Sequence, residues 1–189
     1  MSTSYRVANR TTVYREHGGA DVRVEKLEVL SSAGTFTTHA VSTKDASCGA
    51  VCIAIKEEKI LLARHWRATT ESHEWEFPRG MGEQGETVEQ TAQRELLEET
   101  GITASTTTLL GHIHADTGIL RDDIAVAVLA ITDEKTTRTT DGELEDIRWV
   151  EPATLDTMIA HNEIRDGITL AAYLLWGTLH RLSKAPSPR

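Results

Sequence analysis

Three glutamates at helical spacing are the residues of this chain best placed to do chemistry. Glu95, Glu98 and Glu99 occupy positions i, i+3 and i+4 of the run R-E-L-L-E-E-T, so a helix would place them on one face. Like charges at this spacing repel, and a divalent cation would offset that repulsion. Carboxylate oxygens are hard ligands that suit Mg²⁺ or Mn²⁺. Taken alone, such a run is more often a solvated helix face, so the hypothesis depends on the surrounding residues.

The flanking residues predict a helix over residues 88–100. Thr87 can cap its start, with Gln90 as the return partner of a capping box. Gly101 supplies the residue after the end that can turn left-handed. A glycine-containing loop precedes the helix and would allow backbone to approach a ligand closely and expose amides to an anion at the helix N-terminus; its glycines are Gly80, Gly82 and Gly85.

The stretch as a whole fits the pattern G-x5-E-x7-R-E-U-x-E-E-x-G-U, in which U is an apolar residue. It resembles the Nudix box without a departure, and the matching residues are Gly80, Glu86, Arg94, Glu95, Leu96, Glu98, Glu99, Gly101 and Ile102. The resemblance implies an α/β (α+β) fold, the Nudix α/β/α sandwich with a mixed sheet, over residues 46–182. It also implies hydrolysis of a nucleoside diphosphate linked to another group, with Mg²⁺ or Mn²⁺ held by the box glutamates.

Composition limits the other function classes. The chain has 189 residues, 39% of them hydrophobic, and a formal net charge of −9, which lacks the basic footprint of nucleic-acid binders. No apolar run is long enough for a membrane span and no secretory signal is visible, so we expect a cytoplasmic protein. Cys48 and Cys52 fall in one predicted strand, too far apart for a relaxed disulfide, and are expected to be free thiols.

The N-terminal part differs from the rest. Residues 1–45 contain a hairpin signal at Gly18-Gly19 and a third β-like run, and predict a small antiparallel β unit. Three strands alone are marginally stable, so this unit should pack on the main domain or on another subunit. Residues 46–182 alternate irregularly between strands and helices, which indicates a mixed sheet flanked by helices. Residues 183–189 are expected to be a disordered tail.

Segments outside the box resemble the ADP-ribose pyrophosphatase group of Nudix hydrolases. These segments are W-E-F-P-R-G, D-T-G-I-L-R-D-D, E-L-E-D-I-R-W-V and N-E-I-R-D-G-I-T-L-A-A. The resemblance implies hydrolysis of ADP-ribose or a related nucleoside diphosphate sugar to AMP (or another nucleoside monophosphate) and a sugar phosphate, by a homodimer in which the N-terminal unit mediates dimerisation. Two departures bear on the substrate: Arg79 stands where the group usually has alanine, and Asp116-Thr117 stands where it has Ser-Pro.

The resemblance also implies residue roles. The metal ligands would be Glu95, Glu99, Glu98, Glu145 and the backbone carbonyl of Arg79, with Glu86 as a further candidate. Glu143 would be the general base, on a Gly-containing loop able to close over substrate, although both it and Glu145 could simply be exposed acids. Arg94 would orient the box carboxylates. Substrate contacts would come from Arg67 and the Arg79 side chain on phosphate and from Trp66 or Trp75 on the adenine. The alternatives are a surface arginine for Arg67 and core packing for Trp75.

Two other functions remain open at this point. The chain could hydrolyse a different nucleotide, such as a dinucleotide polyphosphate or a nucleoside triphosphate. It could also be a non-catalytic nucleotide-sensing module on a Nudix scaffold, since fold alone does not settle function.

Overall fold

The computed structural model describes residues 4–18, 21–43, 48–132 and 144–184. Contacts divide the chain into two compact units. The larger unit comprises residues 48–113 and 124–189, and the smaller one comprises residues 1–47 and 114–123.

The smaller unit is an antiparallel three-stranded sheet in the order β1-β2-β3. Its strands are β1 (Arg6–Arg15), β2 (Arg23–Ser31) and β3 (Gly34–Ser42), as the hairpin signal predicts. The segment 114–123 adds to this sheet along β3: the Val41 amide donates to the Ile119 carbonyl at 2.8 Å, and the Arg121 amide donates to the Val41 carbonyl at 2.7 Å. The Arg121 guanidinium lies 3.2 Å from the carboxylate of Glu25, a largely buried residue of β2.

The larger unit is built on a mixed sheet in the order β10-β5-β4-β9-β8, with β6 paired to β5 and β7 paired to β4. Strands β4 and β9 run parallel, and the other pairs are antiparallel. The strands are β4 (Gly49–Lys56), β5 (Lys59–Arg67), β6 (Ser72–Glu76), β7 (Arg79–Met81), β8 (Thr106–Ile113), β9 (Ile124–Ala130) and β10 (Leu144–Val150).

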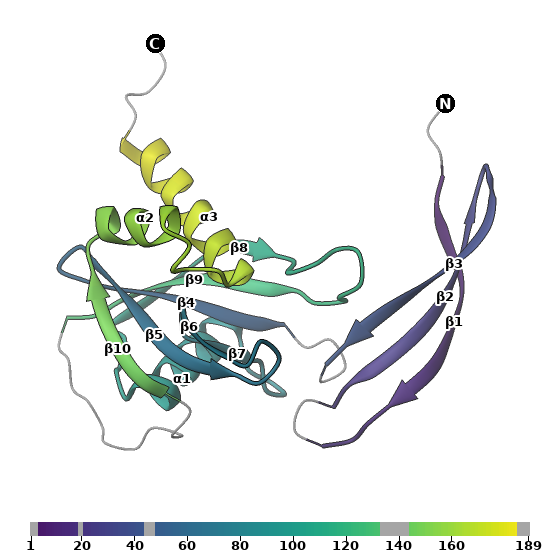
Figure 1. Ribbon diagram of the computed structural model, residues 1–189, viewed down its shortest axis with the longest axis horizontal. Coiled ribbons are helices and arrows are strands. Elements are labelled where there is room, and N and C mark those ends of the chain that lie inside the picture. Colours follow the sequence, from purple (N-terminus) through teal and green to yellow (C-terminus); the bar gives the residue numbers. More distant parts are fainter. Residues whose placement is uncertain (1–3, 19–20, 44–47, 133–143, 185–189) are drawn as a thin grey trace, which may run out of the picture. The chain divides into compact units, whose positions relative to one another are not determined.

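Helices cover both faces of this sheet (Figure 1). Helix α1 (Val88–Thr100) packs on one face, and α2 (Pro152–Ala160) and α3 (Gly167–Lys184) pack on the other. Strand β4 is a continuous apolar run because both of its faces are buried. Its residues alternate between the layers, so that Ala50 and Cys52 join the α1 core whereas Val51 and Ile53 join the α2–α3 core. This arrangement confirms the expected α/β class and mixed sheet.

The local signals around α1 are confirmed. Thr87 and Gln90 form the capping box, and Gly101 takes the left-handed conformation with φ 71°. Both cysteines are free thiols, as expected. Helix α3 continues through Lys184, so the first two residues of the predicted tail are helical, and residues 185–189 lie outside the described part. Among the described helices, none has the length and apolar character needed to cross a membrane.

Candidate metal and active site

The box glutamates sit on α1 at different depths. Glu99 is buried, Glu95 is half-buried and Glu98 is exposed. Burial, reinforced by the negative charges of Glu99 and Glu98, raises the pKa of Glu95, while Arg94 opposes that shift. The site therefore concentrates negative charge on one face of the helix, as the spacing predicts.

Arg94 holds several of these groups together. Its guanidinium donates to Glu86 at 2.8 Å, to Glu95 at 2.8 Å and to Glu98 at 2.9 Å. It also donates to the Met81 carbonyl at 2.8 Å, which ties the helix to β7. Hydrogen bonding from Arg94 is the main reason that the pKa of Glu86 falls to about 2. Arg94 thus contacts three carboxylates of the box and one strand carbonyl at the same time.

Gly80 and Glu95 approach each other closely. A Cβ atom on residue 80 would lie 2.1 Å from the Glu95 carboxyl carbon and 2.1–2.2 Å from its two oxygens. Only a residue without a side chain leaves room for this carboxylate. The first glycine of the box is therefore required by the position of one of its glutamates.

The donor set suits a divalent cation. Four carboxylates, those of Glu86, Glu95, Glu98 and Glu99, lie on or beside one helix face, and the Arg94 guanidinium is paired with the first three. Hard carboxylate oxygens with an excess of negative charge match Mg²⁺ or Mn²⁺. These residues fit the metal that the box implies.

His65 is a member of the site that sequence reasoning missed. Its Nε2 lies 3.6 Å from Glu99 Oε2, and both side chains are almost fully buried. Alternation along β5 carries the only available signal, because it places His65 on the same face as Leu61 and Ala63. Leu61 belongs to the core under α1, so His65 should have been expected to face that helix.

The two arginines expected to contact phosphate converge on one buried acid. Glu76 is 1% exposed and is paired with Arg67 through two nitrogens, at 3.0 and 2.6 Å. Arg79 lies 2.9 Å from Glu76 and 2.7 Å from Asp166. These groups line a pocket of about 400 Å³ at the start of α3. Both guanidinium groups are therefore paired with carboxylates in the wall of this pocket.

The remaining predicted residues are not brought together with the α1 carboxylates by any described contact. Glu145 pairs with His73 at 2.6 Å and with Arg64 at 3.6 Å. Trp66 is 53% exposed on β5, and it follows His65 directly, so the two side chains point to opposite faces of the sheet. Glu143 lies outside the described residues.

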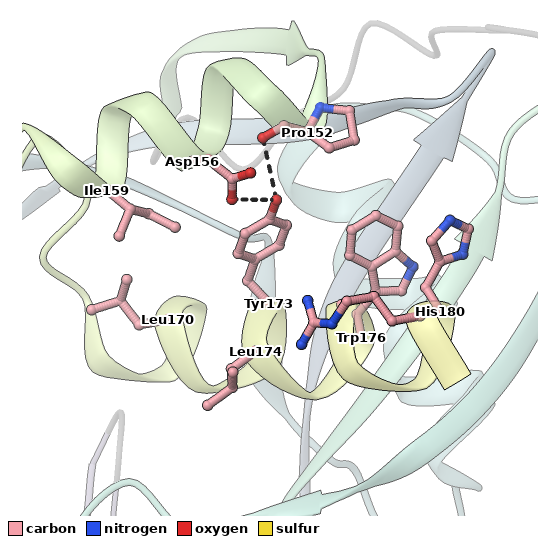
Figure 2. Close-up of a pocket in the computed structure, with 10 residues that line it drawn as sticks. Pro152, Asp156, Ile159, Leu170, Tyr173, Leu174, Trp176 and His180 are labelled. Carbon is pink, nitrogen blue, oxygen red and sulfur yellow. Dashed lines mark hydrogen bonds between the residues drawn. The ribbon is translucent and has the colours of Figure 1, made fainter. Parts of the chain in front are cut away.

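A second pocket, of about 450 Å³, lies between α2 and α3. Figure 2 shows the side chains that line it, with Trp176 between Tyr173 and His180. The Tyr173 hydroxyl donates to Asp156 at 2.9 Å, and burial is the main reason that its pKa is raised. No residue of the predicted site lines this pocket, so the α1 cluster remains the candidate active site.

Comparison with known proteins identifies the family of this chain. The family model described as NUDIX domain matches residues 46–171. No curated protein matches the sequence. Among solved structures, a crystal structure described as an ADP compounds hydrolase matches with a TM-score of 0.78 and 20% sequence identity, covering 95% of this chain and 96% of that one. Such a likeness reports on the fold. The family match spans most of the chain and includes the whole carboxylate cluster, and the chain therefore belongs to the Nudix family.

Proposed function

We propose that this protein hydrolyses the pyrophosphate bond of ADP-ribose or a related nucleoside diphosphate sugar, releasing a nucleoside monophosphate and a sugar phosphate. The observation that carries the proposal is the intact carboxylate cluster on α1, held by Arg94 and packed against Gly80. The segments outside the box that resemble the ADP-ribose pyrophosphatase group support the substrate class. The similar fold of an ADP compounds hydrolase is consistent with it.

In this proposal Glu95, Glu98 and Glu99 hold Mg²⁺ or Mn²⁺, and the Arg79 carbonyl completes the ligand set. When bound, the metal supplies charge neutralisation at the phosphates and a more acidic water. Arg94 keeps Glu95 and Glu98 in place, and the buried imidazole of His65 lies 3.6 Å from the Glu99 carboxylate. Glu145 would have to give up its ion pairs with His73 and Arg64 to bind the metal. We therefore rank it below the α1 glutamates as a metal ligand.

Glu143 is the proposed general base. It would accept a proton from the attacking water. It lies two residues before Glu145 in the sequence E-L-E, next to the start of β10. A carboxylate at the end of a loop can close over bound substrate, which suits this role.

Arg67 is the better supported of the two substrate contacts. Its guanidinium is bound to Glu76 but its side chain is still 30% exposed, so it can also meet a phosphate oxygen. Successive residues of a strand point to opposite faces, so Trp66 and Arg67 cannot contact the same part of a ligand from the same side. We propose that Arg67 contacts a phosphate group of the substrate and that Trp66 stacks on its base at the opposite face of the sheet.

The N-terminal unit is proposed to mediate homodimerisation. Every residue of β1 is exposed, and Tyr5, Val13 and Tyr14 present apolar surface at 65%, 53% and 50% exposure. A three-stranded sheet of this kind gains stability by covering such surface. Light scattering on the full chain should give twice the mass of one chain, and a strictly monomeric mass would refute this part of the proposal.

Metal-dependent turnover tests the core of the proposed function. Wild-type protein should hydrolyse ADP-ribose with Mg²⁺ or Mn²⁺, and Glu99→Gln should lose most of that turnover while keeping the fold. Glu89→Gln is the matched control, because Glu89 lies in the first turn of the same helix, at a position where the box pattern allows any residue. A wild-type protein that binds nucleotide without metal-dependent turnover would favour the sensing module instead.

A further inference from the structure

Strand β7 is only three residues long, yet each residue meets a different part of the site. Gly80 lies against the Glu95 carboxylate. The Met81 carbonyl accepts a hydrogen bond from Arg94 at 2.8 Å. Arg79 carries the guanidinium that binds Glu76 and Asp166. The position of β7 therefore sets where Glu95 and Arg94 lie.

The Arg79 side chain points away from the metal site. Arg79 pairs with Val51 of β4, and Gly80 pairs with Ala50. Val51 belongs to the core under α2 and α3, whereas Ala50 belongs to the core under α1. Because neighbouring strand residues face opposite ways, Gly80 faces α1 and the Arg79 side chain faces the start of α3.

At the start of α3, a set of hydrogen bonds links two residues to the helix. These are Arg79, the first residue of β7, and Phe77, which directly follows β6. Asp166 accepts from the Arg79 guanidinium at 2.7 Å, and from the Thr169 amide and hydroxyl at 2.8 Å each. The Thr169 hydroxyl in turn accepts from the Phe77 amide at 3.0 Å. The chain segment from Phe77 to Arg79 is thus fastened to α3 at both ends, directly before the metal-binding residues begin.

The electrostatics of this contact make it strong. Although burial would raise the pKa of Asp166, the charge of Arg79 and the hydrogen bonds from Thr169 hold it below its usual value. Glu76, on the other side of the guanidinium, is almost completely buried. Removing Arg79 would leave two buried or half-buried carboxylates without this shared cation, and β7 would lose its attachment to α3.

We propose that Arg79 is a positioning residue for the metal site, which acts by fastening β7 to Asp166 at the start of α3. This inference rests on the proposed function, since it concerns the metal held by the α1 glutamates. It assigns the Arg79 side chain to support of β7 and not to a phosphate. Groups that do not touch the metal but hold its ligands in position typically contribute 10–100-fold to metal affinity.

Mn²⁺ binding without nucleotide, measured by electron paramagnetic resonance, tests the inference separately from turnover. Arg79→Ala should weaken Mn²⁺ binding by about 10-fold, and Arg79→Lys, which keeps one ion pair, should recover part of it. At saturating metal, kcat should fall more than KM for the nucleotide rises. Arg165→Ala is the matched control: Arg165 pairs with Glu74 in the same pocket, and among the described residues no hydrogen bond or ion pair joins it to β7, so Mn²⁺ affinity should stay at the wild-type value.

Asp166→Asn covers the case in which Arg79→Ala fails to fold. Asparagine can still cap the helix by accepting from the Thr169 amide, but it removes the charge that Arg79 meets, and Mn²⁺ affinity should again fall. Unchanged Mn²⁺ affinity in both folded variants would overturn the inference. So would a variant that loses nucleotide affinity alone, because Arg79 would then be a substrate ligand. If the wild type itself bound no Mn²⁺, the proposed function would fail first.

Discussion

Replacing Gly80 with alanine would place a methyl group where the Glu95 carboxylate now lies. The new Cβ atom would be 2.1 Å from the carboxyl carbon, whereas ordinary contact begins at 3.4 Å. The carboxylate must therefore retreat by about 3.4 − 2.1 = 1.3 Å, because the strand backbone is held on the other side by β4. This perturbation changes the geometry of one proposed metal ligand without removing any functional group.

The magnitude follows from that displacement. Misplacing a catalytic group by about 1 Å can cost on the order of 100-fold in rate, so we expect kcat to fall by about that factor. Stability should change little, since the clash involves the end of a flexible side chain. Gly80 is not in a left-handed conformation, and in such a position alanine stabilises by about 0.4–1 kcal/mol through the unfolded state.

The assay is Mg²⁺-dependent release of AMP from ADP-ribose, with thermal unfolding measured on the same samples. Gly111→Ala is the control, because its Cβ atom would meet only a Leu175 methyl group at 3.5 Å. Gly80→Ala should lose activity with a near-normal Tm, and Gly111→Ala should lose neither. Near-full activity in Gly80→Ala would refute the reasoning that the position of Glu95 matters for catalysis.

Three further predictions follow from the site. Glu99→Gln should keep its Tm within a few degrees, lose most of its turnover and bind Mn²⁺ more weakly by electron paramagnetic resonance; near-full activity would remove Glu99 from the metal site. Glu86 has a folded-state pKa of about 2 against 4.5 for the free group, so its pairing with Arg94 stabilises the fold fully above pH 4.5 and is lost as the pH falls towards 2. The Tm advantage of wild type over Glu86→Gln should therefore shrink across that interval, and a constant difference would contradict the ion pair. Glu143→Gln should lose most of its turnover but bind Mn²⁺ like the wild type, and normal turnover would exclude Glu143 as the base.

Features set by short-range interactions could be predicted from the sequence. The ends of α1 are determined by Thr87, Gln90 and Gly101, all within a few residues of the helix. The common face of the glutamates follows from helix geometry alone. The apolar character of β4 likewise indicates burial on both faces, which its two cores confirm.

Features set by tertiary packing could not be predicted. The partners of Arg79 are a case in point, because Asp166 lies 87 residues away in the sequence and no periodicity relates the two. The attachment of the segment 114–123 to β3 depends on backbone hydrogen bonds that carry no sequence signature. The position of His65 beside Glu99 can be predicted from the alternation of side chains along β5, but only when the face of the sheet covered by α1 is known.

The most direct test of the central claim is a product analysis over a panel of nucleotides with Mg²⁺ or Mn²⁺. The panel would contain ADP-ribose, ADP-glucose, GDP-mannose, diadenosine polyphosphates and dGTP. Our account predicts a clear preference for ADP-ribose or another nucleoside diphosphate sugar, with AMP or the corresponding monophosphate as product. Preference for dGTP or for a dinucleotide polyphosphate would contradict the proposed substrate class, and no turnover on any compound, despite metal binding, would contradict the proposed catalytic function.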